Sequence, residues 1–313
     1  MNLQQLEYIL AINQFQSFTK AAEHCNVTQA TLSMMVKKLE EELEIIIFDR
    51  SKQPIITTEL GKKIIDQSVK ILGETQNLYQ LASSEKKELS GNFRLGIIPT
   101  IAPYLLPKIL RKFQKNYPKV TLYVNEFTTD QIIEKLKSNQ IDAGLLATPL
   151  LENTIKEYPL YYEKYMVYAN KEDSINQKEY ILPDDIEIQK LWLLEEGHCM
   201  RNQILHLCEL KRKESSLSQL HYEASSISTL IQLVDHHYGM TIIPELAVAE
   251  LNQHQKGQVR AFADPSPVRE ISLVTHYHYV KEKFVQSLAK VIKDEIPKTM
   301  QEPPIESKQI LGI

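Results

Sequence analysis

Two cysteines in the second half of the chain have the residue types and surroundings for thiol redox chemistry. Cys199 and Cys208 lie nine residues apart in the segment GHCMRNQILHLC. Cys199 follows a strand-like run and a glycine, which predicts a strand-to-helix turn where free backbone amides favour an anion. Together with His198 and Arg201, these amides should lower the pKa of the thiol and increase its thiolate fraction. A thiolate is the nucleophile that attacks a peroxide oxygen and is oxidised in the process.

The segment between the two cysteines is expected to be helical. In a continuous helix their Cα atoms would lie about 13.5 Å apart, at about 1.5 Å per residue. A disulfide tolerates a Cα separation under about 7 Å. Oxidation of Cys199 to a sulfenic acid, followed by attack of Cys208, would therefore have to unwind the helix. This pattern predicts a two-state switch driven by covalent chemistry.

Two other interpretations of the cysteines remain open. Free cysteine is among the most buried residue types, so both could be inert core residues. His198, Cys199, His206 and Cys208 are also metal-ligand types, but a continuous helix would hold its two ends too far apart for one ion. We therefore expect no metal and no cofactor. Cys25 is expected to be a small packing residue.

A second candidate site lies near the N-terminus. The segment from 17 to 50 predicts two helices around a turn, with the small pair Ala21-Ala22 where they approach and Thr28 capping the second helix. This is the layout of a helix-turn-helix, whose second helix, about Thr28 to Leu43, fits a major groove roughly 12 Å wide. The candidate DNA-contacting residues offer hydrogen-bonding groups for bases and cations for phosphates: Thr28, Gln29, Thr31, Ser33, Lys37, Lys38 and Arg50.

The alternative for this segment is a helical hairpin that contacts protein. Residues 1–63 hold seven Lys or Arg against eight Asp or Glu, which does not favour DNA. The acids cluster after the turns that would enter the groove, however: Glu40, Glu41, Glu42 and Glu44. The expected reading face itself is therefore not anionic.

The rest of the chain must position these two sites. The apolar spacing from 59 to 89 predicts one long amphipathic helix, whose stripe we expect to pair with a second copy rather than with its own domain. Beyond Ser90-Gly91-Asn92, alternating strands and helices predict a mainly parallel sheet. Strands are expected at 93–99, 120–127, 141–149, 163–170, 191–196, 238–244 and 269–277, with helices at 104–116, 129–139 and near 281–294.

Composition limits the possible classes of protein. With 313 residues, 43% hydrophobic and 24% charged, the chain is expected to fold into more than one domain. It shows no apolar run of the roughly 18 residues that a membrane span needs, and no basic leader. We therefore expect a cytoplasmic protein, not bound to a membrane, whose cysteines are thiols by default. The net charge of −4 gives no general support to nucleic-acid binding.

The N-terminal segment resembles the LysR-type transcriptional regulators. The shared elements are Ala21-Ala22, Thr28-Gln29, Thr31-Leu32-Ser33, Lys38-Leu39-Glu40, and Phe48 with Arg50. The chain departs from the family at Ala30, where proline is usual, at Met34 and Met35, where polar or basic residues are common, and at Glu44, where glycine is usual. The departures bear on base preference more than on the fold.

This resemblance implies the fold and its domains. It implies an N-terminal winged helix-turn-helix, all-α with a small β wing, at 1–58, and a long dimerising linker helix at 59–89. An α/β two-lobed regulatory domain similar to periplasmic binding proteins would follow at 90–300. Its lobe I would comprise about 90–162 and 267–300, and its lobe II about 163–266. A flexible tail would occupy 301–313.

The segment EEGHCMRNQILHLC further resembles the sensing segment of the peroxide-responsive members of that family. Stretches at 98–107, 122–131 and 221–230 match as well. The resemblance implies that Cys199 is the peroxidatic thiol and Cys208 the resolving thiol. It also implies a peroxide pocket formed by Thr100, Thr129, His198, Arg201 and Arg269, with Arg269 polarising the oxygen that leaves. Two departures are Asn202, where aspartate is usual, and His236-His237, where small residues are usual.

The function implied is that of a regulator, not an enzyme, that detects hydrogen peroxide and activates oxidative-stress genes. Its implied partners are double-stranded promoter DNA, RNA polymerase, further copies of itself as a dimer of dimers, and a thiol reductant such as a glutaredoxin or thioredoxin. One rival is a LysR-type regulator that answers a small-molecule effector, with the cysteines incidental. A second rival is a thiol peroxidase, which would have no use for a DNA-reading segment.

Overall fold

The structure is a computed structural model that describes residues 1–52, 54–83, 89–208, 224–277, 279, 282–304 and 310–312, without the side chains of 76, 77 and 79–83. The chain forms two compact units. One comprises Met1–Lys87 and Lys137–Gln140, and the other comprises Glu88–Leu136 and Ile141–Ile313. Among the described residues, no helix is both long enough and apolar enough to span a bilayer.

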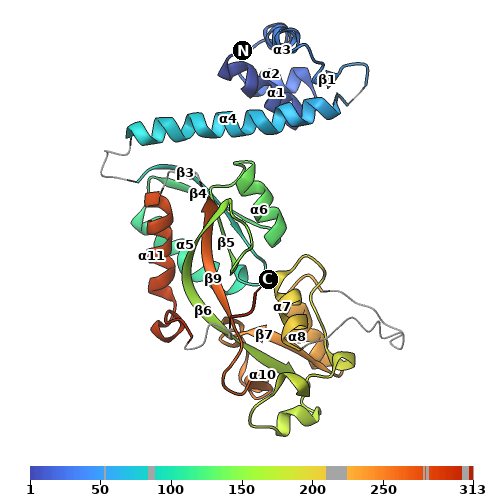
Figure 1. The fold of residues 1–313 in the computed structure, drawn as a ribbon, viewed down its shortest axis with the longest axis vertical. Helices are drawn as coiled ribbons and strands as arrows, with labels where there is room; N and C mark the ends of the chain where they lie inside the picture. Colours follow the sequence, from blue (N-terminus) through green and yellow to red (C-terminus); the bar gives the residue numbers. More distant parts are fainter. Residues whose placement is uncertain are drawn as a thin grey trace. The chain divides into compact units, whose positions relative to one another are not determined.

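The N-terminal unit is a small helical domain with a two-stranded wing (Figure 1). Its elements are α1 (Leu3–Phe15), α2 (Phe18–His24), α3 (Gln29–Leu43), β1 (Phe48–Asp49), β2 (Ile56–Thr57) and α4 (Glu59–Ser83). Thr28 caps α3 as predicted, because its side-chain oxygen accepts from the backbone amide of Thr31. Ala21 and Ala22 are buried between helices, so the close approach expected there is confirmed.

Helix α4 begins where the long linker helix is predicted and continues to Ser83. The prediction extends the helix to residue 89, but Leu89 is not helical, and residues 84–88 lie outside the described residues. Two members of the predicted apolar stripe, Leu60 and Leu78, are 49% and 66% exposed. Two other members, Ile64 and Ile71, pack against the core of the N-terminal unit. The stripe therefore lies partly against its own domain, and pairing of its exposed part with a second copy stays a prediction.

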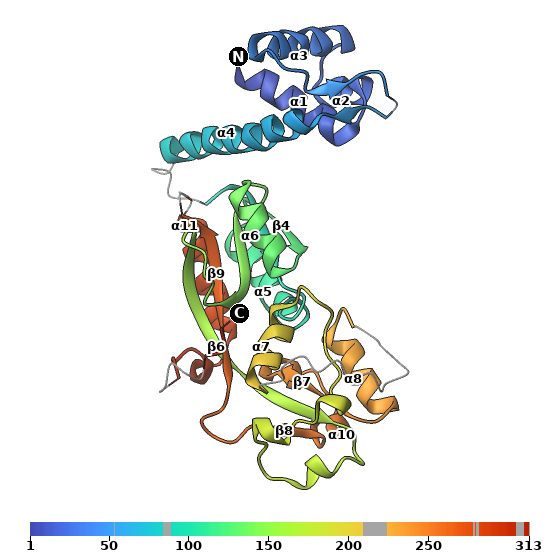
Figure 2. The same ribbon diagram turned by 45° about the vertical axis from the view of Figure 1, so that its right-hand side comes forward.

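The second unit corresponds to the predicted regulatory domain and is called the regulatory unit below. It is built on a curved sheet flanked by helices (Figures 1 and 2). Its strands are β3 (Gly91–Ile97), β4 (Val120–Glu126), β5 (Ala143–Thr148), β6 (Ile155–Ala169), β7 (Met240–Pro244), β8 (Val259–Ala261) and β9 (Val268–His276). Its helices are α5 (Ala102–Asn116), α6 (Thr129–Lys137), α7 (Cys199–Leu207), α8 (Ile227–His236), α9 (Glu245–Val248), α10 (Gln253–Lys256) and α11 (Glu282–Glu295). Short 3₁₀ helices span Ser174–Gln177, Pro183–Asp185, Ile188–Lys190 and Lys298–Met300.

The strand order is β4-β3-β5-β9-β6-β7, with β8 also paired to β6. Strand β6 pairs with β9 from Ile155 to Lys164 and with β7 from Tyr165 to Ala169. Its partners therefore change at the position where the second lobe is expected to begin. Strands β6 and β9 run side by side through the unit (Figure 1), and their register places Glu163 opposite Arg269.

The prediction of a mainly parallel sheet is wrong. Among the strands of the described residues, the pairs β3–β4 and β3–β5 are parallel, whereas the pairings of β6 and β9 are antiparallel. The chain leaves one half of the sheet along β6 and returns along β9, so these two long strands run in opposite directions. The strand predicted at 191–196 is also wrong, because this stretch makes only isolated bridges, Leu191 with Met240 and Leu194 with Ala224.

The end of the chain differs from the predicted flexible tail. Residues 305–309 and 313 lie outside the described residues, but Ile310 and Leu311 are held in place. Ile310 forms a bridge with Val268 at the start of β9, and the Leu311 amide donates to the Val268 carbonyl at 3.0 Å. The tail is therefore not loose at these two positions.

Candidate functional site

Cys199 is the first residue of α7, where the sequence predicts the helix to start, but the segment before it is not a strand; only 4% of Cys199 is exposed. His198 is the capping residue before it, and its ring Nε2 lies 3.7 Å from the Glu195 carboxylate. Thr129 begins α6 and Thr100 follows β3. Both threonines are buried, as is His198. Three separate elements therefore carry the predicted pocket residues into the interior of the regulatory unit.

Arg269 brings a positive charge into this pocket from β9. Its guanidinium is 1% exposed and forms an ion pair with Glu163, with Nη2 2.8 Å from Oε2. It also donates from Nη1 to the Thr100 hydroxyl at 3.0 Å and from Nη2 to the Thr100 carbonyl at 3.2 Å. Burial is the largest influence on the pKa of Arg269 and lowers it, but Glu163 together with Tyr165, Tyr161 and Cys199 raises it, so the net shift is upward and the group stays charged.

The predicted low pKa of Cys199 is wrong. Burial raises the pKa of this thiol above its usual value, because the thiolate loses its hydration. The Thr129 side chain, the Arg269 charge and the backbone groups of Met200 and Ala147 oppose this shift without cancelling it. The cation that acts on the sulfur is therefore Arg269, brought close by the fold.

Arg201, the cation predicted from sequence proximity, has a different position. Its Nη1 donates to the carbonyl of Leu194 at 2.6 Å, in the segment that precedes α7. Arg201 is only partly buried, whereas Arg269 is fully buried. The structure thus brings together Cys199, Thr129, Thr100 and Arg269. Arg201 instead holds the segment that precedes α7.

The Thr129 hydroxyl lies at the sulfur and lacks a regular partner. It lowers the pKa of the Cys199 thiol, yet its oxygen is buried and makes no hydrogen bond of ordinary geometry within the described part of the chain. A buried hydroxyl whose neighbour is a thiol sulfur, a weak acceptor, keeps much of its hydrogen-bonding capacity unused. Beside a thiol and a buried guanidinium, such a group is suited to a small polar molecule with oxygen atoms.

Cys208 lies at the other end of α7, where it caps the helix. It is 8% exposed, and burial raises its pKa to about 11. Both thiols are free, and the helix between them is continuous, so their Cα atoms are separated by about 13.5 Å on ideal helix geometry. The two sulfurs cannot bond while α7 is intact.

The alternative metal site gains no support from this geometry. His198 and Cys199 stand at one end of α7 and Cys208 at the other, while His206 is exposed. A search of the described residues finds no cluster of three His, Cys, Asp or Glu side chains that could hold an ion. Cys25 is half-buried in the N-terminal unit, where burial raises its pKa.

Sequence reasoning missed Glu163, Tyr165 and Gln203. Glu163 orients Arg269 and also accepts from the Leu246 amide at 2.8 Å. The Tyr165 hydroxyl donates to the side-chain oxygen of Gln203 at 2.5 Å. A glutamate at the start of a predicted buried strand is the one local signal that could have identified Glu163, because a buried carboxylate requires a partner.

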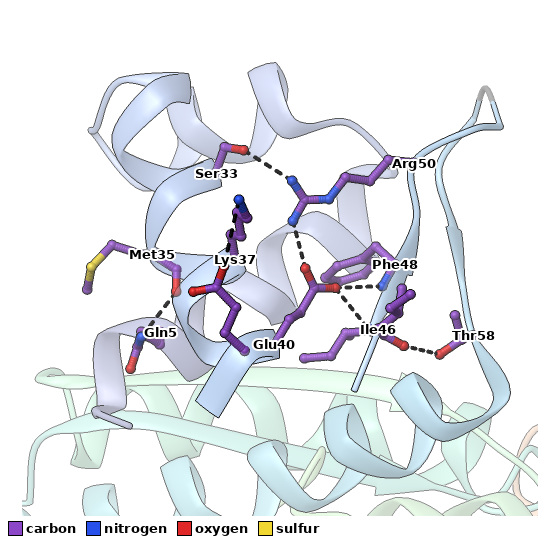
Figure 3. A network of polar contacts seen from close by, with 11 residues as sticks. Gln5, Ser33, Met35, Lys37, Glu40, Ile46, Phe48, Arg50 and Thr58 are labelled. Carbon is purple, nitrogen blue, oxygen red and sulfur yellow. Dashed lines mark hydrogen bonds and ion pairs between the residues drawn. The ribbon is translucent and has the colours of Figure 1, made fainter. Parts of the chain in front are cut away.

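Most of the predicted DNA-contacting residues are exposed on α3 or at its start: Thr28, Gln29, Thr31, Lys37 and Lys38. The hydroxyls of Thr28 and Thr31 contact each other at 2.9 Å. Ser33 and Arg50 also contact each other, since Arg50 Nη1 lies 3.4 Å from the serine hydroxyl. Arg50 also pairs with Glu40 at 2.7 Å (Figure 3). Its guanidinium lies over the Phe18 ring, 4.9 Å from the ring centroid.

Glu40 explains why the acids of α3 do not form an anionic reading face. Its carboxylate accepts from the amides of Ile47 and Phe48 in addition to Arg50, and so joins α3 to the wing (Figure 3). Glu41 pairs with Lys37 at 3.7 Å, and Glu42 with the N-terminal ammonium at 2.5 Å. Each of these carboxylates therefore has a positive or donor partner.

Two family models match the chain. The LysR substrate binding domain matches residues 86–297, and the bacterial regulatory helix-turn-helix protein of the lysR family matches residues 3–62. These matches cover both units and agree with the predicted winged helix-turn-helix and two-lobed regulatory domain.

Three similar proteins extend this result. The hydrogen peroxide-inducible genes activator of Haemophilus influenzae is 33% identical over 299 residues, which are 95% of this chain and 97% of that protein. A full-length OxyR variant from Pseudomonas aeruginosa has a TM-score of 0.77 at 32% identity, covering 94% of this chain and 98% of that one. A hydrogen peroxide-bound OxyR variant from Corynebacterium glutamicum has a TM-score of 0.60 at 26% identity, covering 94% of each chain. The chain belongs to the LysR family of DNA-binding transcriptional regulators, and its relatives in that family include OxyR proteins.

Proposed function

We propose that this regulator senses hydrogen peroxide through Cys199 and records the signal as a Cys199–Cys208 disulfide. The observation that carries the proposal is the buried Thr129 hydroxyl, which lies at the Cys199 sulfur without a regular partner while Arg269 supplies a positive charge beside both. The hydrogen peroxide-bound relative supports the same ligand class.

The chemistry follows from the groups in the pocket. The Cys199 sulfur attacks one peroxide oxygen, the O–O bond breaks, and the thiol becomes a sulfenic acid while the other oxygen leaves as water. Thr129 and Thr100 hold the oxygens, and Arg269 stabilises the negative charge on the oxygen that leaves. The raised pKa of Cys199 keeps the resting thiol protonated. The two threonines and Arg269 therefore act mainly at the moment when the thiol loses its proton and attacks. His198 is the N-terminal capping residue of α7, and Arg201 holds the segment before the helix through its hydrogen bond to the Leu194 carbonyl.

The disulfide step converts this local reaction into a structural change. The Cys208 thiol attacks the sulfenic sulfur, a disulfide forms and water leaves, which requires α7 to unwind. We propose that this change reshapes the contacts between copies in a dimer of dimers joined through α4, and so alters binding to promoter DNA and contact with RNA polymerase. A thiol reductant such as a glutaredoxin or thioredoxin would return the bond to two thiols.

For DNA contact, we propose Thr28, Gln29, Thr31, Lys37 and Lys38 as the residues that reach the groove and the phosphates. Ser33 and Arg50 belong to the same proposed surface, although both also hold the wing to α3. Loss of a phosphate contact at Lys38 is expected to reduce the salt dependence of binding by about one unit of slope.

The test is the response of the full-length chain to peroxide. The protein is treated with hydrogen peroxide, alkylated, digested and analysed by mass spectrometry, and a peptide pair joined through residues 199 and 208 is expected. Cys199→Ser should abolish both this crosslink and any peroxide-dependent change in transcription, whereas Cys25→Ser should leave both intact. An unchanged transcriptional response in Cys199→Ser would favour the small-effector regulator. Repeated turnover of peroxide with a thiol donor would favour the peroxidase.

A further inference from the structure

Gln203 connects the sensing helix to two distant parts of the chain. It lies in the middle of α7 and its exposed fraction is 0%. Its side-chain oxygen accepts from the Tyr165 hydroxyl at 2.5 Å, and its side-chain nitrogen donates to the Leu311 carbonyl at 2.7 Å. Both ends of a buried amide are thus satisfied, one by β6 and the other by the C-terminal residues.

The C-terminal residues are in turn attached to β9. The Leu311 amide donates to the Val268 carbonyl at 3.0 Å, and Ile310 forms a parallel bridge with the same residue. Val268 immediately precedes Arg269, the cation of the redox pocket. Residues 310–311 therefore join β9 to α7 through backbone groups on one side and Gln203 on the other.

We propose that Gln203 is a positioning residue that holds α7 folded through Leu311, and that disulfide formation releases the C-terminal residues. This rests on the proposed function. Gln203 lies four residues after Cys199 and five before Cys208, within the segment that must unwind when the sulfurs join. An unwound segment cannot keep one side chain at both Tyr165 and the Leu311 carbonyl.

The physical consequence is a barrier that acts on the second step only. Attack of the Cys199 sulfur on peroxide needs the folded helix and its pocket, so it proceeds with the Gln203 contacts in place. Closure of the disulfide needs those contacts broken. From the net strength of a typical hydrogen bond, removing one of them is expected to accelerate closure about fivefold, and removing both about thirtyfold.

Two variants and one control isolate this contact. A chain ending at Gln309 lacks the Leu311 carbonyl, and Gln203→Met lacks both side-chain contacts at similar volume. Leu311→Ala is the matched control, because it removes the side chain but keeps the backbone carbonyl that accepts from Gln203. When the truncation at Gln309 and Gln203→Met are combined, their effects on the rate of disulfide closure should not add fully, since both remove the hydrogen bond between Gln203 and Leu311.

The experiment gives the full-length protein and each variant a single pulse of hydrogen peroxide and follows sulfenic acid and disulfide separately by quenched mass spectrometry. We expect an unchanged rate of sulfenic acid formation in the chain ending at Gln309, faster closure in that chain and in Gln203→Met, and closure near the original rate in Leu311→Ala. Hydrogen exchange at the Leu311 amide should rise once the unaltered chain is oxidised.

The outcomes separate the two proposals. If the unaltered chain forms no disulfide, the proposed function fails. If it forms the disulfide but the chain ending at Gln309 closes at the original rate, or the Leu311 amide stays protected in the oxidised protein, the role of Gln203 and the C-terminal residues is refuted. A slower sulfenic acid step in Gln203→Met alone would place Gln203 in the pocket chemistry and overturn its positioning role.

Discussion

Each unit of this protein contains an arginine–glutamate pair that joins two of its segments. In the N-terminal unit Arg50 pairs with Glu40 at 2.7 Å, and the two side chains are 38% and 12% exposed. In the regulatory unit Arg269 pairs with Glu163 at 2.8 Å, and both side chains are 1% exposed. The residue types and the distances are nearly the same, so the two pairs differ chiefly in how far their side chains are exposed to solvent.

That difference assigns the pairs different roles. Water screens Arg50, so its pair with Glu40 supplies modest stability and leaves part of the guanidinium accessible to a phosphate. Arg269 has lost its water, and its charge is tolerated only because Glu163 and Thr100 surround it. A buried, fixed charge is expensive to keep but acts strongly on a neighbouring sulfur.

The largest effect is expected from Glu163→Gln. This change leaves the Arg269 charge buried without its counter-ion, and should lower the free energy of unfolding by about 3–5 kcal/mol. Chemical denaturation measures the loss, and the double variant Glu163→Gln with Arg269→Met should recover part of it. A loss below about 1 kcal/mol would mean that burial does not distinguish the two pairs.

A second prediction concerns Cys208 and pH. In the unfolded chain this thiol ionises near its usual pKa of 9.0, whereas in the folded protein it ionises at about 11. Between these values the unfolded state gives up a proton that the folded state retains, so stability falls as the pH rises from 9 to 11. The two-unit difference corresponds to at most about 2.7 kcal/mol.

The comparison for Cys208 is with Cys208→Ala, which has no thiol to ionise at this position. Unfolding under reducing conditions should show a steeper loss of stability above pH 9 in the unaltered protein than in this variant. The loss below pH 9 should be the same in both. Parallel curves up to pH 11 would contradict the idea that burial controls this thiol.

A smaller effect is expected at the exposed pair. Arg50→Gln removes the ion pair with Glu40 and the contact with the Phe18 ring, and should cost about 1 kcal/mol of unfolding free energy. Lys38→Gln, on the exposed side of α3, should cost under about 0.5 kcal/mol. Thermal unfolding of the two variants provides the measurement. Equal costs would show that the Arg50 contacts contribute nothing to stability.

The smallest effect is a gain at the end of α3. Glu44 adopts a left-handed conformation, with φ 55°, at the position where the family usually has glycine. Glu44→Gly should raise the unfolding free energy by about 0.5–1 kcal/mol, because glycine adopts this conformation without steric cost. Glu42→Gly, inside the helix, should instead lower stability by about 1 kcal/mol. A loss of stability in both variants would refute the explanation.

Local sequence determined much of this protein. The spacing of Leu32, Val36 and Leu39 gives α3 its buried face, and Thr28 fixes where it starts. The same reasoning placed Cys199 at the beginning of a helix and Cys208 near its end. Helical periodicity and capping depend on residues within a few positions of each other, so one sequence is sufficient to find them.

Tertiary structure alone decided the chemistry around Cys199. The pairing of β6 with β9 places Glu163 opposite Arg269, more than one hundred residues apart, and no local pattern encodes that register. Burial raises the pKa of Cys199 although its sequence neighbours suggest the opposite. The hydrogen bond between Gln203 and Leu311 likewise depends on tertiary structure, which brings these two residues together. Desolvation and strand register arise only from long-range packing, and these two factors set the charge, access and mobility of the sensing helix.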